Sequence, residues 1–174
     1  PGETLRYYYH ENVYRPSAES HTFQEISQMG LEMLGAVGEA QMQQAVRLAA
    51  QSLAQLGAAW VLEVSHMGYL FGLFDALGVP ENARPGLLEK LREKNAHELR
   101  RAAQAAGLDA AGAAALTGLL ELSGSCEETL AKAESACHND RMRAAAAELR
   151  ALAKTLEASG GAVRLDLSLA GEME

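Results

Sequence analysis

The chain has 174 residues, of which 48% are hydrophobic and 22% are charged, and its formal net charge at pH 7 is -8. This length and hydrophobicity suffice for one or two small cores and exclude an intrinsically disordered chain. The acidic balance argues against a nucleic-acid-binding surface, because phosphate contacts need clustered Lys and Arg, and here the cations are interspersed with acids.

The sequence also bears on location and on bound metals. No run of about eighteen apolar residues occurs, and no basic region followed by an apolar one opens the chain, so we expect neither a membrane span nor a signal peptide. Cys126 and Cys137 form no CxxC motif, and only His138 beside them is of a metal-ligand type. We therefore expect a cytoplasmic protein without a metal or another cofactor. Because Pro1 is not an initiator and a predicted strand lies next to the C-terminus, we expect a piece of a longer protein.

The first third of the chain predicts strands and one helix. Two aromatic or β-prone runs, residues 5–14 and 23–34, predict neighbouring antiparallel strands joined by a polar loop. Apolar residues then recur at helical spacing between Gly38 and Gly57, which predicts an amphipathic helix that ends at a glycine. Residues 60–67 predict a third strand. The order strand, strand, helix, strand is typical of a mixed sheet with helices on one face.

The rest of the chain changes character after Gly68. Residues 69–159 are rich in Ala and are punctuated by Gly, Pro and Asn, which predicts a series of closely packed helices. Apolar and polar residues then alternate over residues 163–169, as in a strand with one apolar face. The polar positions of this alternation are Arg164, Asp166 and Ser168. We predict an α+β fold in which a helical insertion, residues 69–159, interrupts a sheet domain formed by residues 1–68 and 160–174.

One group of side chains in the second predicted strand could bind a ligand. Gln28, Gly30 and Glu32 have the same parity, so they share one face of the strand, and the glycine would leave open space between an amide and a carboxylate. An amide oxygen and an ionised carboxylate both accept hydrogen bonds from a protonated amine. The alternative is a solvated sheet face opposite Met29 and Leu31, and periodicity alone favours this alternative.

Other polar residues carry weaker signals. Arg15 ends the first predicted strand, where an arginine usually forms a surface ion pair. His66 ends the third predicted strand, next to a loop, and a structural histidine is the simpler interpretation. His10 and His21 have no second metal-ligand cluster beside them. The chain contains no GxxxxGK[ST], GxGxxG, GxSxG or HExxH motif, so no short motif indicates catalysis.

The run LRYYYHENVYRPSAESHTFQEISQMGLEMLG resembles motif 2 of class II aminoacyl-tRNA synthetases. It is most similar to the histidyl branch and to its paralogue, the regulatory subunits of ATP phosphoribosyltransferase. Arg15 matches the arginine of the motif, and the segment from Gln28 to Glu32 matches the Q-x-G-x-E of the branch. The resemblance continues through VLEVSHMGYLFGLFDALG and ends at VRLDLSLAGEME, whereas the helical middle is similar in position and character only.

The resemblance implies a fold and a ligand site. The fold would be part of a class II synthetase-like mixed or antiparallel sheet with helices, interrupted by the mostly helical insertion. In the histidyl branch the Q-x-G-x-E pair holds the amino group of histidine, so Gln28 and Glu32, with Gly30 between them, would contact histidine here. This reverses the preference from periodicity. Arg15 would be a vestigial phosphate-binding arginine.

Two departures from the synthetase pattern imply that adenylation is lost. Gly171-Glu172-Met173-Glu174 stand where the synthetases have R-G-L-D, so the activating arginine is missing. The segment from Ser17 to Thr22 replaces a loop with further arginines in a G-R-x-R pattern. Without cations that face the triphosphate, the electrostatic stabilisation that phosphoryl chemistry requires would be weak. We therefore expect no catalytic residues.

The leading hypothesis is a non-catalytic regulatory subunit. It would assemble with the short catalytic subunit of ATP phosphoribosyltransferase for the first step of histidine biosynthesis, and would mediate activation and feedback by histidine as effector. The full-length protein would form a homo-oligomer, and this piece alone would bind histidine weakly or not at all. The alternatives are a fragment of histidyl-tRNA synthetase, which activates histidine with ATP, and an independent helical interaction module at residues 69–159.

Overall fold

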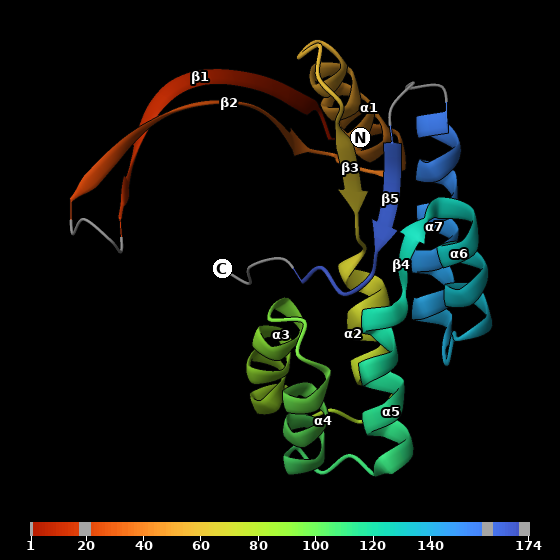
Figure 1. Cartoon of the computed structure of the whole chain (residues 1–174). Helices are drawn as coiled ribbons and strands as arrows, with labels where there is room; N and C mark the ends of the chain where they lie inside the picture. The colour runs from red at the N-terminus through yellow and green to blue at the C-terminus, as the bar shows by residue number, and fades with distance from the viewer. Residues whose placement is uncertain (1, 18–21, 158–161, 171–174) are drawn as a thin grey trace. The chain divides into compact units, whose positions relative to one another are not determined.

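A computed structural model describes residues 2–17, 22–157 and 162–170 of the chain (Figure 1). The chain divides into two compact units, Pro1–Leu48 and Ala49–Glu174. The first unit holds a β-hairpin and most of the first helix. The second holds a small sheet and a set of packed helices.

The hairpin of the first unit consists of β1 (Thr4–Pro16) and β2 (Phe23–Gly35). The two strands pair antiparallel from Thr4 opposite Gly35 to Pro16 opposite Phe23. Figure 1 shows that the hairpin is long and arched. Gly35 has a φ of 97°, and a Cβ there would collide with the carbonyl of Glu3, so a glycine is needed where β2 ends. The predicted pair of antiparallel strands is confirmed.

The helix predicted between Gly38 and Gly57 is α1 (Glu39–Ala54). A side chain of its first turn caps its N-terminus: Gln41 Oε1 accepts from the backbone N–H of Gly38 at 3.1 Å. Gly57 follows the helix with a φ of 67°, the left-handed conformation that commonly ends helices.

The sheet of the second unit has the strand order β3-β5-β4. Its central strand β5 (Ala162–Asp166) pairs parallel with β3 (Val61–Val64) and antiparallel with β4 (Ser123–Ser125). The return of the chain to a sheet is confirmed, but two predicted lengths were wrong. The third predicted strand ends at Val64 because His66 caps the following helix, and the last ends at Asp166 because a turn begins at Leu167.

The region between β3 and β5 is mostly helical, as predicted. Its α-helices are α2 (Met67–Ala76), α3 (Arg84–Arg92), α4 (Ala96–Ala105), α5 (Ala110–Gly118), α6 (Cys126–Ser135) and α7 (Asp140–Leu156). Short 3-10 turns lie at Glu81–Ala83 and Leu119–Glu121. Five of these helices begin at a side-chain N-cap that accepts from a backbone N–H of the first turn, at His66, Asn95, Asp109, Ser125 and Asn139. The polar punctuation of this Ala-rich region therefore marks helix starts.

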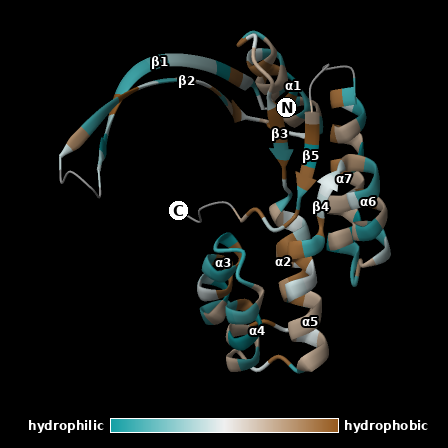
Figure 2. Cartoon of the chain, in the orientation of Figure 1, coloured by the Kyte–Doolittle hydropathy of each residue, from teal (hydrophilic) through white to brown (hydrophobic). Residues whose placement is uncertain are grey.

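The core of the second unit consists of leucine, alanine and a few aromatic side chains. Phe74, Leu91, Leu99 and Leu149 are essentially inaccessible to solvent. Tyr69 on α2 is equally buried and satisfies its hydroxyl by donating to the carbonyl of Ala133 at 2.8 Å. Figure 2 shows hydrophobic residues concentrated on α2 and hydrophilic ones along α3 and α4. In the part of the chain that the structure describes, no helix has the length and apolar character needed to cross a bilayer.

Candidate functional site

The ligand site predicted from the sequence lies on one face of the β-hairpin. The antiparallel register sets Tyr7 opposite Glu32, Tyr9 opposite Gly30, and Glu11 opposite Gln28. Residues directly opposite each other in an antiparallel pair point to the same side of a sheet. The face that carries Gln28 and Glu32 therefore also carries two tyrosines and a second carboxylate, all from β1.

Tyr9 is the residue of this face that sequence reasoning missed. Its hydroxyl accepts a hydrogen bond from Gln28 Nε2 at 3.0 Å, and both side chains are half-buried in a hairpin that is otherwise mostly exposed. Its ring lies over Gly30: a Cβ added to Gly30 would come within 2.5 Å of Tyr9 Cζ. The open space predicted above Gly30 was therefore wrong, because the ring of the cross-strand neighbour fills it. The sequence offered no signal for this contact, because it depends on the register between the two strands.

The remaining acceptors of this face are unpaired among the described residues. The carboxylates of Glu32 and Glu11 make no hydrogen bond or ion pair with another described side chain, and Gln28 makes only its bond to Tyr9. Two carboxylates and an amide oxygen without a neighbouring cation make a negative surface, and such a surface favours a ligand with an ammonium group. That Gln28, Gly30 and Glu32 contact histidine stays a prediction.

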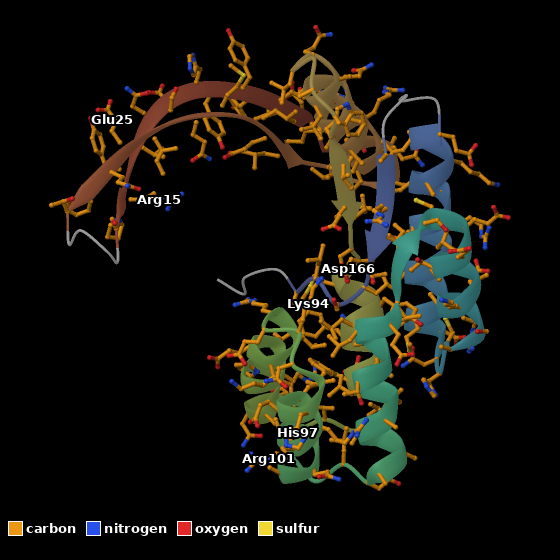
Figure 3. All side chains as sticks on the ribbon, viewed as in Figure 1. Arg15, Glu25, Lys94, His97, Arg101 and Asp166 are labelled. Carbon is orange, nitrogen blue, oxygen red and sulfur yellow. The ribbon has the colours of Figure 1, made fainter. Side chains whose placement is uncertain are left out.

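Arg15 shares this face but lies far along it. It pairs with Gln24, four residues beyond Glu11, which is roughly 13 Å at the rise of an antiparallel strand. Figure 3 shows Arg15 on the inner side of the arch and Glu25 on the outer side. Arg15 forms no ion pair with a described residue. That Arg15 is a vestigial phosphate-binding arginine stays a prediction.

His66 has a structural role at the start of α2. Its Nδ1 accepts from the backbone N–H of Gly68 at 3.0 Å, which makes it the N-cap of the helix. Because Nδ1 accepts, Nε2 carries the proton and donates to Glu148 Oε2 at 2.9 Å on α7. His10 lies on the opposite face of the hairpin from Gln28 and contacts Ser27 Oγ at 3.2 Å.

Several predicted features lie outside the described residues. These are His21, most of the loop from Ser17 to Thr22, and the segment Gly171–Glu174. The cysteines are described: both are free and half-buried, and burial raises the pKa of each thiol above its ordinary value. Among the described residues no group of three or more His, Cys, Asp or Glu could hold a metal ion.

A second polar cluster, not predicted from the sequence, joins the α3–α4 corner to the end of β5. Asp166 is buried, and its carboxylate receives Lys94 Nζ at 2.6 Å and the backbone N–H of Ser168 at 3.0 Å. Burial acts to raise the pKa of Asp166, but the hydrogen bonds from Lys94 and Ser168 outweigh it and hold the pKa below its usual value. Lys94 has a φ of 52°, and Arg92 Nε donates to the carbonyl of Ala170 at 3.2 Å. Figure 3 shows Lys94 and Asp166 side by side.

Comparisons with known proteins agree with the resemblance seen in the sequence. The family model for histidyl-tRNA synthetase matches residues 2–174. Two curated relatives, each named ATP phosphoribosyltransferase regulatory subunit, come from Desulfitobacterium hafniense strains DCB-2 and Y51; they are 36% and 35% identical over 92 residues. These alignments cover 52% of this chain and 24% of each relative, so the matched segment spans about a quarter of their length.

Two solved structures share the fold. One is an ATP phosphoribosyltransferase regulatory subunit/histidyl-tRNA synthetase from Bacillus halodurans, with 28% identity and a TM-score of 0.80 over 95% of this chain and 44% of that one. The other is the ATP phosphoribosyl transferase (HisG:HisZ) complex from Thermotoga maritima, with 17% identity and a TM-score of 0.74 over 97% of this chain and 59% of that one. The predicted resemblance and the predicted α+β, class II synthetase-like fold are confirmed.

Proposed function

Because the chain belongs to the histidyl-tRNA synthetase family, we propose that it is part of a non-catalytic regulatory subunit of ATP phosphoribosyltransferase. One observation carries the proposal: the hairpin keeps the acceptors for an amine, at Gln28 and Glu32, while the stretch from Pro16 to Thr22 contains no arginine or lysine. A site that keeps amino-acid recognition and lacks cations for a triphosphate suits binding rather than adenylation. The names of the curated relatives support the same role.

The proposed partner is the short catalytic subunit of ATP phosphoribosyltransferase. A regulatory subunit, which is what the relatives are named, requires a catalytic one to act on. The reaction of the assembly is the condensation of ATP with phosphoribosyl pyrophosphate, at the start of histidine biosynthesis. The full-length protein would be a cytoplasmic homo-oligomer within this assembly.

The proposed effector is histidine, held by its amino group. Its ammonium would be bound by the acceptors of Gln28 and Glu32, which share one face of β2. Feedback then requires histidine to bind two states of the assembly with different affinity, which amounts to a coupling free energy between its site and the catalytic subunit.

The decisive experiment mixes the full-length protein with a short-form catalytic subunit and measures phosphoribosyl transfer with and without histidine. We expect activation by the protein and inhibition by histidine. Glu32→Gln should keep the activation and raise the inhibitory histidine concentration about tenfold or more, because a charge-assisted hydrogen bond is lost. The matched control is Glu25→Gln, on the opposite face of the same strand (Figure 3), which should leave inhibition unchanged.

An alternative role as a synthetase would give a different result in a second assay. The Bacillus halodurans structure carries both names, so the alternative has support among the neighbours. Histidine-dependent exchange of pyrophosphate with ATP by the full-length protein, together with no activation of the catalytic subunit, would establish the synthetase and overturn the regulatory role.

A further inference from the structure

We propose that Tyr9 is a positioning residue of the histidine site: it turns the Gln28 amide so that its oxygen accepts the ligand's ammonium. The inference rests on the function proposed above and adds a residue from β1 to a site otherwise formed by β2. Tyr9 acts through Gln28 and does not itself hold the amino group.

The first step of the argument is the hydrogen bond between the two side chains. Gln28 Nε2 donates to the Tyr9 hydroxyl at 3.0 Å, a normal distance for such a bond. Tyr9 and Gln28 lie two positions apart along the ladder, because Tyr9 is opposite Gly30 and Gln28 is opposite Glu11. The bond is therefore diagonal, within the reach of long side chains on one face of an antiparallel pair.

The second step is the orientation that the Gln28 amide adopts in this bond. With Nε2 directed at Tyr9, Oε1 points away from it and has no partner among the described residues. The opposite orientation would let Oε1 accept from the hydroxyl and would present Nε2, a donor, to the ligand. An ammonium has only donors to offer, so it is compatible with the first orientation alone.

The third step is the glycine beneath the ring. A Cβ on Gly30 would come within 2.5 Å of the Tyr9 hydroxyl and 2.8 Å of Cε1, which is closer than van der Waals contact allows. Any larger residue would displace the ring and its hydroxyl from Gln28. The middle residue of the Q-x-G-x-E segment is thus needed in this chain because Tyr9 covers it.

The fourth step is the charge of the surrounding face. Glu11 is the cross-strand partner of Gln28, and Glu32 lies four residues along β2 on the same face. Both carboxylates are exposed, and neither pairs with a described cation. The two carboxylates and the outward amide oxygen share one face of the hairpin and make it negative, which favours a ligand with an ammonium group.

The test is a double-mutant cycle in the full-length protein, with binding measured by calorimetry. The variants are Tyr9→Phe, Gln28→Ala and the double variant, and the probes are L-histidine and imidazolepropionate, which is the same molecule without its amino group. Tyr8→Phe is the matched control, because Tyr8 is 90% exposed and lies on the opposite face, opposite Leu31.

We expect Tyr9→Phe to weaken L-histidine binding about fivefold, the effect of one lost hydrogen bond, and Tyr8→Phe to leave it unchanged. In the Gln28→Ala background Tyr9→Phe should have no further effect, because the amide it orients is gone. Imidazolepropionate should bind to the wild-type protein and to Tyr9→Phe equally well.

Two results would overturn the inference, and they are distinct. The first result is that the wild-type protein binds L-histidine and the Tyr9→Phe variant binds it with the same affinity, or that Tyr9→Phe lowers the affinity for both probes equally. In that case Tyr9 does not orient the amide, and the proposed function stands. If the wild-type full-length protein binds no L-histidine, the histidine site itself fails and this inference fails with it.

Discussion

Large apolar side chains are exposed in the hairpin and buried in the helical unit. In β1 and β2 no side chain is buried, and Tyr8 and Met29 are 90% and 75% exposed. In the unit of Ala49–Glu174, Tyr69, Phe74 and leucines from α2 to α7 lose nearly all contact with water. Since burial of apolar area is the main source of folding free energy, the helical unit supplies stability and the hairpin supplies exposed polar groups.

This difference implies that stability and ligand recognition can be changed separately. A two-stranded hairpin is marginal by itself in water, so its residues contribute little to the free energy of unfolding of the helical unit. The groups that could hold an amine, at Gln28 and Glu32, lie on such a hairpin. We therefore expect substitutions in the helical unit to change the unfolding free energy and substitutions at the hairpin face to change ligand binding.

The largest expected effect on stability is at the centre of the helical core. Leu149 on α7 is completely buried, so Leu149→Ala should lower the free energy of unfolding by about 3 kcal/mol, through lost burial and the cavity that remains. Urea denaturation of the full-length protein measures it. Leu56→Ala is the matched control, because Leu56 is 71% exposed and its loss should cost almost nothing. Equal effects of the two variants would contradict the comparison.

The next effect is expected at the α3–α4 corner. Asp166→Asn keeps the size of a buried side chain but removes the charge that receives Lys94, so it should lower the free energy of unfolding by about 2 kcal/mol at pH 7. Asp109→Asn, at an exposed N-cap that an asparagine serves equally well, is the matched control. A loss at Asp109 as large as that at Asp166 would contradict a specific role for the buried carboxylate.

The stabilising effect of the Asp166 charge should depend on pH. The pKa of Asp166 is lower in the folded protein than its ordinary value of 3.8, so its charge stabilises the fold fully above that value. The contribution is lost as pH falls through the lower, folded-state pKa. The difference in unfolding free energy between the wild-type protein and Asp166→Asn should therefore be constant near neutral pH and shrink below about pH 4. A difference that grows on acidification would show that the carboxylate is not the source.

How far the sequence predicted the fold depends on how local the signals were. The aromatic or β-prone runs of β1 and β2, and the Gly, Pro and Asn that punctuate the Ala-rich region, are local signals, and both predictions were confirmed. The ends of β3 and β5 were missed because they depend on distant partners. His66 leaves the strand to cap α2 and reach Glu148, and Asp166 ends its strand where Lys94 binds it.

The site shows the same limit. Parity along β2 was enough to put Gln28 and Glu32 on one face, because strand geometry alone determines it. The occupant of the space above Gly30 depends on the register between the strands, and the register pairs Gly30 with Tyr9 across the hairpin. The length of the loop between the strands left that register open, so Tyr9 could not be named from the sequence.

A smaller effect on stability is expected at the start of α2. His66→Ala removes an N-cap and the bond to Glu148, and should lower the free energy of unfolding by about 1 kcal/mol. His97→Ala is the matched control, since His97 on α4 is exposed (Figure 3) and has no partner among the described residues. Thermal denaturation compares the two variants. If His66→Ala is as stable as the wild-type protein, the N-cap at His66 does not stabilise the fold.

The smallest expected effect on stability, and a clear effect on binding, is at Gly30. Gly30→Ala displaces the Tyr9 ring from the Gln28 amide, yet it lies in a strand without a buried residue, so the free energy of unfolding should change by less than about 0.5 kcal/mol. L-histidine binding by the full-length protein should weaken at least as much as in Tyr9→Phe. Gly118→Ala is the matched control: a Cβ there has open space, and alanine favours helices, so neither stability nor binding should fall. A Gly30→Ala protein that unfolds far more easily would show that the hairpin carries stability after all, because a ligand-binding face alone would not respond in that way.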